Sequence, residues 1–72
     1  MEHKVIDILK DVFDVEELDS TCSQENTPEW DSMAQLNIVA ELEDAFDVSI
    51  EPEEIAKMKT FEDIISILKS KL

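Results

Sequence analysis

Apolar residues recur at the three- and four-residue spacing of an α-helix in three stretches of this 72-residue chain, and this pattern constrains the fold most. The stretches predict helices over residues 2–14, 32–47 and 60–71. Their apolar positions are Val5, Ile8, Leu9 and Val12, then Met33, Leu36, Val39, Leu42 and Phe46, then Phe61, Ile64, Ile65, Leu68 and Leu72. The sequence therefore predicts an all-α fold.

Proline and polar residues define the connections. Pro52 follows Glu51 and suits the first position of a helix, so we predict a short third helix over residues 52–58. Residues 15–31 are mostly polar, contain a Thr-Pro turn signal and lack a sustained apolar period, so we expect a long loop there. A chain of this length forms one small domain at most. The expected architecture is a small four-helix bundle over residues 1–72, with a short third helix and a long loop between the first two helices.

Capping residues mark two helix starts. Ser32 and Gln35 have the capping-box spacing, in which the serine oxygen accepts from the third amide and the glutamine reaches back. We therefore expect Ser32 to cap the second long helix. Thr60 is expected to cap the last helix, which has Lys69 and Lys71 near its negative end.

Acidic residues greatly outnumber basic ones, since 19 Asp and Glu against 6 Lys give a net charge of −13 at pH 7. Such a charge repels nucleic acid phosphates and anionic lipid, so we expect basic proteins or cations as partners, with neither nucleic acid binding nor membrane insertion. No apolar run approaches the roughly 18 residues of a membrane span or forms a signal peptide. One cysteine cannot close an internal disulfide. We therefore expect a cytoplasmic monomer.

Missing residue types exclude several kinds of chemistry. The chain has no glycine, so it cannot build a glycine-rich phosphate loop, a Rossmann fingerprint or an EF-hand turn. His3 is the only histidine and Cys22 the only cysteine, which leaves too few groups for a hydrolytic triad or a structural zinc site. We expect no catalytic residue, no metal centre and no enzymatic activity.

Acidic residues gather around the predicted end of the second long helix. They are Glu41, Glu43, Asp44, Asp47, Glu51, Glu53 and Glu54. This group is a solvated surface, a docking face for basic enzymes or a weak cation site, and the sequence leaves that choice open. Because the carboxylates repel one another, added salt or millimolar divalent cation should raise the melting temperature.

One short motif carries a family resemblance. Trp30-Asp31-Ser32-Met33 precedes an acidic amphipathic helix, and in this it resembles the acyl carrier protein family and its peptidyl carrier relatives. Further similarities are the chain length, the loop before the motif, the acidic stretch 42–48, the short third helix and the Thr-Phe-Glu-Asp start of the last helix. The resemblance implies that a dedicated transferase attaches 4′-phosphopantetheine to Ser32. The thiol of this arm would then carry an acyl or aminoacyl group as a thioester.

The same resemblance implies roles for other residues. Recognition by the phosphopantetheinyl transferase and by basic faces of acyl-loading and acyl-processing enzymes is expected from Asp31, Met33, Glu43, Asp44 and Asp47. An acyl pocket between the second helix and the short helix is expected to have walls from Val39, Leu42, Ile55 and Ile64. Helix capping by Asp31 and simple core packing by the pocket residues are the structural alternatives.

Departures from the family pattern bear on the pathway. Carriers of primary fatty acid synthesis usually have Gly-Ala-Asp-Ser-Leu-Asp and further acids in the next turn, whereas this chain has Trp30 before the motif and Ala34, Gln35 and Asn37 after it. The less acidic helix start favours an acyl carrier of a specialised lipid or polyketide-type pathway. The end of the chain at Leu72 without another domain predicts a freestanding carrier, and a domain excised from a larger synthase would look similar. Trp30 either packs across the helix start or docks partners.

Two other functions remain open on the sequence. A peptidyl or D-alanyl-type carrier has the same motif, and the identity of the cargo separates it from an acyl carrier. An acidic helical interaction protein, such as an inhibitor that covers a basic enzyme face, would need the charge but not Ser32. The substitution Ser32→Ala therefore distinguishes such a protein from any carrier.

Overall fold

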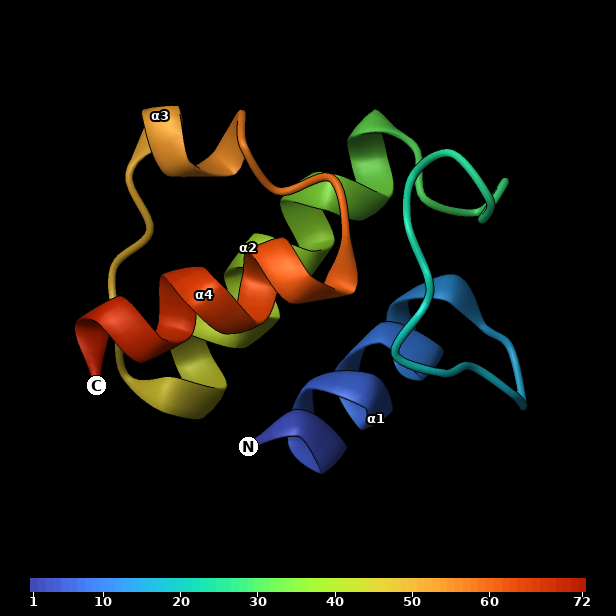
Figure 1. Cartoon of the computed structure of the whole chain (residues 1–72), viewed down its shortest axis with the longest axis horizontal. Coiled ribbons are helices and arrows are strands. Elements are labelled where there is room, and N and C mark those ends of the chain that lie inside the picture. Colours follow the sequence, from blue (N-terminus) through green and yellow to red (C-terminus); the bar gives the residue numbers. More distant parts are fainter.

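The structure, a computed structural model, describes all 72 residues and contains four α-helices and no β-strand. The helices are α1 (Glu2–Phe13), α2 (Ser32–Phe46), α3 (Pro52–Ile55) and α4 (Phe61–Lys71), and a long loop joins α1 to α2 (Figure 1). The predicted all-α fold with a short third helix is confirmed. None of the four helices combines the length and the apolar character needed to cross a membrane.

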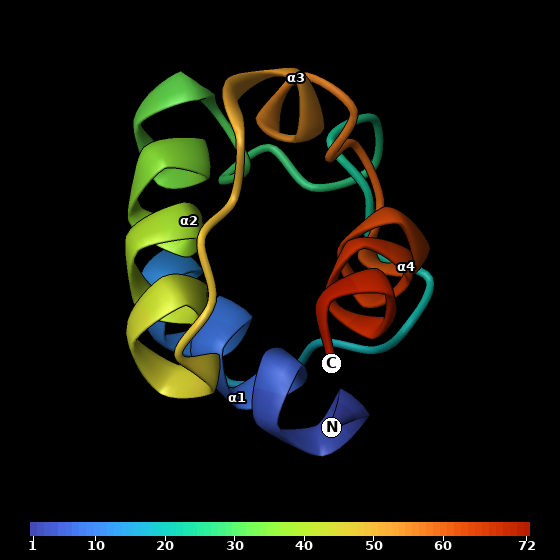
Figure 2. The same ribbon diagram turned by 90° about the vertical axis from the view of Figure 1, so that its left-hand side faces the viewer.

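The helices surround one apolar core. In Figure 2, α2 and α4 lie on opposite sides, α1 lies below them and α3 lies above. The core consists of Val5, Leu9, Phe13, Cys22, Trp30, Ala34, Ile38, Val39, Leu42, Ile50, Met58, Phe61, Ile64, Ile65 and Leu68. These residues come from the three longer helices and from the connecting segments. Removal of their surface from water is the main stabilising term available to so small a domain.

The long loop is fastened to the segment between α3 and α4. The Gln24 N–H donates to the Lys59 carbonyl at 2.8 Å, and the Phe61 N–H donates to the Cys22 carbonyl at 3.0 Å. Cys22 is buried in the core, and this burial raises the pKa of its thiol. The loop therefore follows a fixed path in spite of its polar sequence, because its backbone groups find partners far along the chain.

Aspartates end the first two helices of this glycine-free chain. Asp14 has φ = 56° and Asp47 has φ = 54°, both in the left-handed region. Helices commonly end on such a residue, and glycine usually occupies it because other residues are strained there. The predicted ends at residues 14 and 47 include these cap residues, so each helix stops one residue earlier.

One predicted cap and one predicted helix end are wrong. The second helix begins at Ser32 as expected, but Asp31 caps it, with its carboxylate accepting from the Ala34 N–H at 2.9 Å, so Ser32 is the first helical residue and not the cap. α3 ends at Ile55 and not at residue 58, because the chain turns inward to bury Met58 completely.

The cap of α4 agrees with its sequence pattern. The Thr60 hydroxyl accepts from the Asp63 N–H at 3.0 Å, and the Asp63 carboxylate accepts from the Thr60 N–H at 3.1 Å. This reciprocal pair satisfies two of the amides that a helix start leaves free. α4 therefore begins at Phe61, one residue after the predicted position.

Candidate functional site

The segment before α2 places Ser32 on the surface. Trp30 is 4% exposed and its side chain is drawn into the core, whereas Asp31 and Ser32 are exposed. Because Asp31 provides the cap, the Ser32 side chain has no capping role to perform. A free hydroxyl therefore stands at the N-terminus of a 15-residue helix, where amide groups and the helix dipole favour negative charge.

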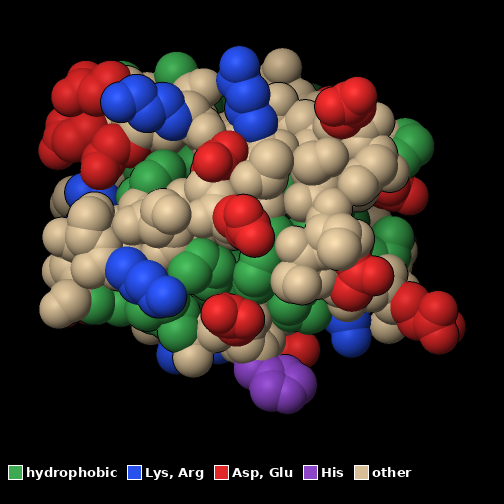
Figure 3. Space-filling model, viewed as in Figure 1, with side chains coloured by type: hydrophobic (Ala, Val, Ile, Leu, Met, Phe, Trp, Pro, Cys, Tyr) green, Lys and Arg blue, Asp and Glu red, His purple; other side chains and the backbone are tan.

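No histidine is near this hydroxyl. The N-terminus of α1 and the start of α2 lie at opposite ends of the molecule in both ribbon views (Figures 1 and 2), and His3 belongs to α1. The only histidine of the chain appears at the lower edge of the surface in Figure 3. The site thus presents a nucleophilic atom without a histidine base beside it.

A buried glutamine links the start of α2 to the end of α3. The Trp30 Nε1–H donates to Gln35 Oε1 at 2.6 Å, while Gln35 Nε2 donates to the Ile55 carbonyl at 2.8 Å and to the Met58 carbonyl at 3.0 Å. We call these two side chains and two carbonyls the Gln35 junction. It contributes a buried polar network in which no side-chain nitrogen or oxygen lacks a partner.

The Gln35 junction was missed by sequence reasoning, which assigned Gln35 to a capping box. The available signal was a glutamine between Ala34 and Ile38, on the side of α2 that faces the core. For Trp30, the structure favours packing over docking, because its ring centre also lies 5.6 Å from that of Phe13.

A surface groove of about 370 Å³ opens beside Ser32. The lining residues are Gln24, Trp30, Asp31, Ser32, Gln35, Ile55 and Ala56. The groove therefore joins the exposed hydroxyl to the Gln35 junction. Of the predicted pocket walls, Ile55 lines this groove, whereas Val39, Leu42 and Ile64 are buried in the core.

The exposed side of α2 carries two large apolar side chains. Met33 is 76% exposed and Leu36 is 64% exposed. The predicted apolar stripe is therefore wrong at its start, because the helix turns a neighbouring face inward. That buried face consists of Ala34, Gln35, Ile38, Val39 and Leu42. Met33 lies next to Ser32 and is available to a partner.

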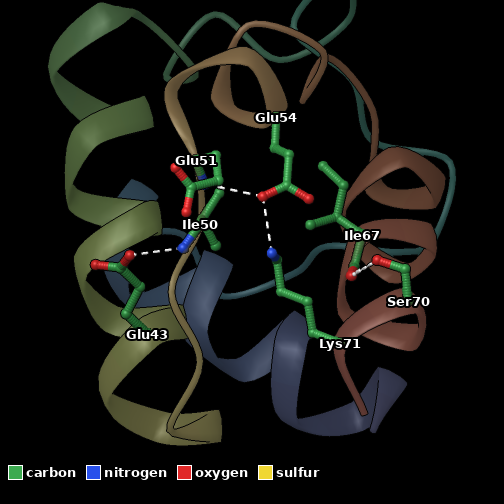
Figure 4. Close-up of polar contacts among 7 residues, drawn as sticks. All are labelled: Glu43, Ile50, Glu51, Glu54, Ile67, Ser70 and Lys71. Atoms are coloured by element: carbon green, nitrogen blue, oxygen red, sulfur yellow. Dashed lines mark hydrogen bonds and ion pairs between the residues drawn. The ribbon is translucent and has the colours of Figure 1, made fainter.

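The predicted docking acids differ in their surroundings. Glu43 is half-buried, and its Oε2 accepts from the Ile50 N–H at 2.8 Å, as Figure 4 shows. Asp44 and Asp47 are exposed. Glu43 thus stabilises the turn after α2 with one carboxylate oxygen, while the other two acids are free to meet a partner.

Acids around α3 are partly neutralised within the chain. The Glu54 carboxylate accepts from the Glu51 N–H at 2.8 Å and pairs with Lys71 Nζ at 2.8 Å (Figure 4). The hydrogen bond from Lys71 is the main reason that the pKa of Glu54 is lowered. Figure 3 shows acidic side chains gathered at the end that carries α3, with lysines beside them. No three acidic, histidine or cysteine side chains are grouped so that they could hold a metal ion.

Comparison of the sequence with known proteins identifies a family. The family model for the phosphopantetheine attachment site matches residues 3–68. The acyl carrier protein of Syntrophus aciditrophicus (strain SB) is 35% identical over 71 residues, which cover 96% of this chain and 89% of that protein. The acyl carrier protein of Exiguobacterium sp. (strain ATCC BAA-1283 / AT1b) is 34% identical over 59 residues, which cover 82% of this chain and 75% of that protein.

A solved structure supports the same fold. It comes from Mycobacterium tuberculosis, is described as a candidate acyl carrier protein, and matches with a TM-score of 0.85 at 18% sequence identity. The match covers 96% of this chain and 95% of that one. The family match and the two relatives, together with this fold, show that the chain belongs to the acyl carrier proteins, which bear 4′-phosphopantetheine and act as carriers, not as catalysts.

Proposed function

We propose that this protein carries acyl groups as thioesters on 4′-phosphopantetheine attached to Ser32 Oγ. The observation that carries the proposal is the exposed Ser32 hydroxyl at the first position of α2, next to an open groove. The family match over residues 3–68 includes this position. An exposed hydroxyl on a rigid helix fits covalent attachment, because the arm can extend from it without disturbing the core.

The surroundings of Ser32 suit a modified residue better than a catalytic one. A phosphodiester at this position would lie at a helix N-terminus, where the dipole favours an anion by about 0.3–1 kcal/mol at an exposed site. No histidine is within reach to activate the hydroxyl, so the base and the Mg²⁺ for attack on the coenzyme A pyrophosphate would come from the transferase. The terminal thiol of the bound arm supplies the thioester chemistry.

The surface beside Ser32 supports docking of partner enzymes. Met33 offers an apolar contact next to the attachment point, and Asp44 and Asp47 offer exposed charge farther along α2. We propose that these residues, with Asp31 and the remaining oxygen of Glu43, meet basic faces of the transferase and of the acyl-processing enzymes in the cytoplasm. Charge contacts of this kind speed encounter and allow rapid exchange, which a shuttle requires.

The start of α2 supports a specialised lipid or polyketide-type pathway. The first turn of α2 contains no acidic residue. A partner that recognises a strongly acidic first turn would therefore gain less from this surface, which favours a different set of enzymes.

A loading assay tests the proposed function. The protein is incubated with a broad-specificity phosphopantetheinyl transferase, coenzyme A and Mg²⁺, and its intact mass is measured. Wild type should gain one phosphopantetheine, and Ser32→Ala should gain none. Ser49→Ala is the matched control, since Ser49 is also exposed, and it should load like wild type. Failure of the folded wild type to load would refute the carrier function and favour an acidic interaction protein.

A charge reversal tests the docking surface. Asp44→Lys should slow loading and weaken its dependence on NaCl, because the encounter would lose a favourable charge contact. Asp7→Lys is the control, because it makes the same charge change at an exposed position on α1. Equal effects of the two substitutions would mean that net charge matters and that α2 has no special docking role.

A further inference from the structure

Gln35 lies between the attachment point and the core. Ser32 and Gln35 are three residues apart on α2, a spacing that puts them on the same side of the helix, and both line the groove. The Gln35 side chain is 9% exposed, and both ends of its amide are hydrogen-bonded. A group that extends from Ser32 along the groove therefore meets the hydrogen-bonded Trp30 and Gln35 side chains before it reaches the other buried residues of the core.

Opening this barrier would break a connected set of hydrogen bonds. If Gln35 swings aside, the Trp30 indole N–H loses its only partner, and the Ile55 and Met58 carbonyls each lose one of two. A buried polar group without a partner is destabilising, and a methylene chain cannot replace the lost bonds.

A second contact resists movement of α3 away from α2. The Glu54 carboxylate pairs with Lys71 of α4 at 2.8 Å, so α3 is fastened to α4 at the same time as the Gln35 junction fastens it to α2. Figure 4 shows this ion pair bridging α3 and the end of α4. α3, which covers one end of the core, is thus bound to both α2 and α4.

We infer that Gln35 determines cargo specificity by keeping acyl chains out of the core, so that this carrier takes short or polar acyl groups and holds them in the groove beside Ser32. The inference rests on the proposed function, since it concerns cargo attached at Ser32. It leaves Val39, Leu42 and Ile64 as core residues and assigns the cargo contacts to the groove, which has both polar and apolar lining residues.

An alkylation series tests the barrier without the transferase. Ser32→Cys in a Cys22→Ala background is alkylated with N-ethyl-, N-butyl-, N-hexyl- and N-octylmaleimide, and the melting temperature of each adduct is compared with that of the unmodified protein. With Gln35 in place, the melting temperature should stay within about 3 °C across the series, because no added methylene is buried. A progressive rise beyond about 3 °C with chain length would overturn the inference.

The same series in a Gln35→Leu background tests the residue itself. Each adduct is compared with its own unmodified parent, so a loss of basal stability does not affect the reading. The melting temperature should now rise by at least about 5 °C from the ethyl to the octyl adduct, because a burying path is open. Asn37→Leu is the control, since it adds the same side chain at an exposed position of α2, and its series should stay flat. A melting temperature that does not change with chain length in the Gln35→Leu background would show that Gln35 does not exclude the chain. If Gln35→Leu does not fold, the series with Gln35 in place still tests whether chains enter the core.

An experiment on the holo-protein separates this inference from the proposed function. Transferase loading with acetyl-, butyryl-, hexanoyl- and octanoyl-coenzyme A gives thioesters whose cleavage by hydroxylamine is timed. All four should be cleaved at similar rates, whereas protection of the octanoyl thioester would overturn the barrier and leave the carrier function standing. Absence of loading, with a flat alkylation series, would refute the carrier function and leave the barrier standing.

Discussion

Replacement of Gln35 by leucine should destabilise the fold by an amount that the Gln35 junction allows us to work out. The Trp30 N–H loses its only acceptor, which costs about 2 kcal/mol for a buried group. The Ile55 and Met58 carbonyls retain one partner each, the Met58 N–H at 3.1 Å and Gln24 Nε2 at 3.3 Å, so their lost bonds cost together about 1 kcal/mol. Apolar contacts of the leucine recover about 1 kcal/mol.

The net cost of Gln35→Leu is therefore about 2 kcal/mol, or a melting temperature lower by about 8–16 °C for a domain of this size. Domains of this length have total stabilities of about 4–11 kcal/mol, so the variant should remain folded in the cold. Thermal melting and urea unfolding, both followed by far-ultraviolet circular dichroism, measure the change. Asn37→Leu, at an exposed position, should stay within about 0.5 kcal/mol of wild type.

A double-mutant cycle identifies the indole contribution. Trp30→Phe alone leaves Gln35 Oε1 without its donor, whereas Trp30→Phe with Gln35→Leu leaves neither partner unpaired. The double variant should therefore be less destabilised than the sum of the single variants, by about 1–2 kcal/mol. A cost for Gln35→Leu below about 0.5 kcal/mol, or strict additivity in the cycle, would refute the reasoning.

Three further predictions concern charge and backbone. Lys71→Met should lower the melting temperature at pH 7, because the Lys71 hydrogen bond lowers the pKa of Glu54 from its usual 4.5. The difference in melting temperature from wild type should disappear as the pH falls through the lowered pKa, since Glu54 then loses its charge. A difference that does not change with pH would contradict the pairing. Asp47→Val should lower the free energy of unfolding in urea by about 1–2 kcal/mol, because valine is strained at φ = 54°. Asp47→Gly should be neutral or stabilising, because glycine adopts this backbone conformation without strain. Equal losses for the two variants would exclude a backbone origin. Added NaCl or MgCl₂ should raise the melting temperature, since the chain has 19 acidic residues and only 6 lysines and the acids repel one another. A melting temperature that does not change with added salt would mean that the acids interact only weakly.

α2 shows where periodicity was insufficient. Apolar residues lie on more than one side of this helix, so the pattern that begins at Met33 and Leu36 and the one that contains Ala34 and Ile38 are both possible core faces. Packing against the other helices chose the second, which left Met33 and Leu36 exposed and turned Gln35 inward. Spacing alone could not decide this, because burial depends on which elements meet the helix.

The sequence by itself determined the features that depend on close neighbours. The four helices, the cap at Thr60 and the Asp-Ser-Met start of α2 all follow from residues within one or two turns of each other, and the acidic charge follows from the composition alone. Helical hydrogen bonds, caps and apolar spacing act over that range, so a single sequence contains them.

Tertiary structure alone decided which distant groups became partners. Gln35 reaches carbonyls 20 and 23 residues away, and Glu43 bonds an amide seven residues on, past the end of its helix. The inward turn that buries Met58 likewise shortened α3. These contacts form only when the collapse of the core brings separate segments together. That is the physical reason why the sequence could locate Ser32 at a helix start but could not show the polar barrier that lies beside it.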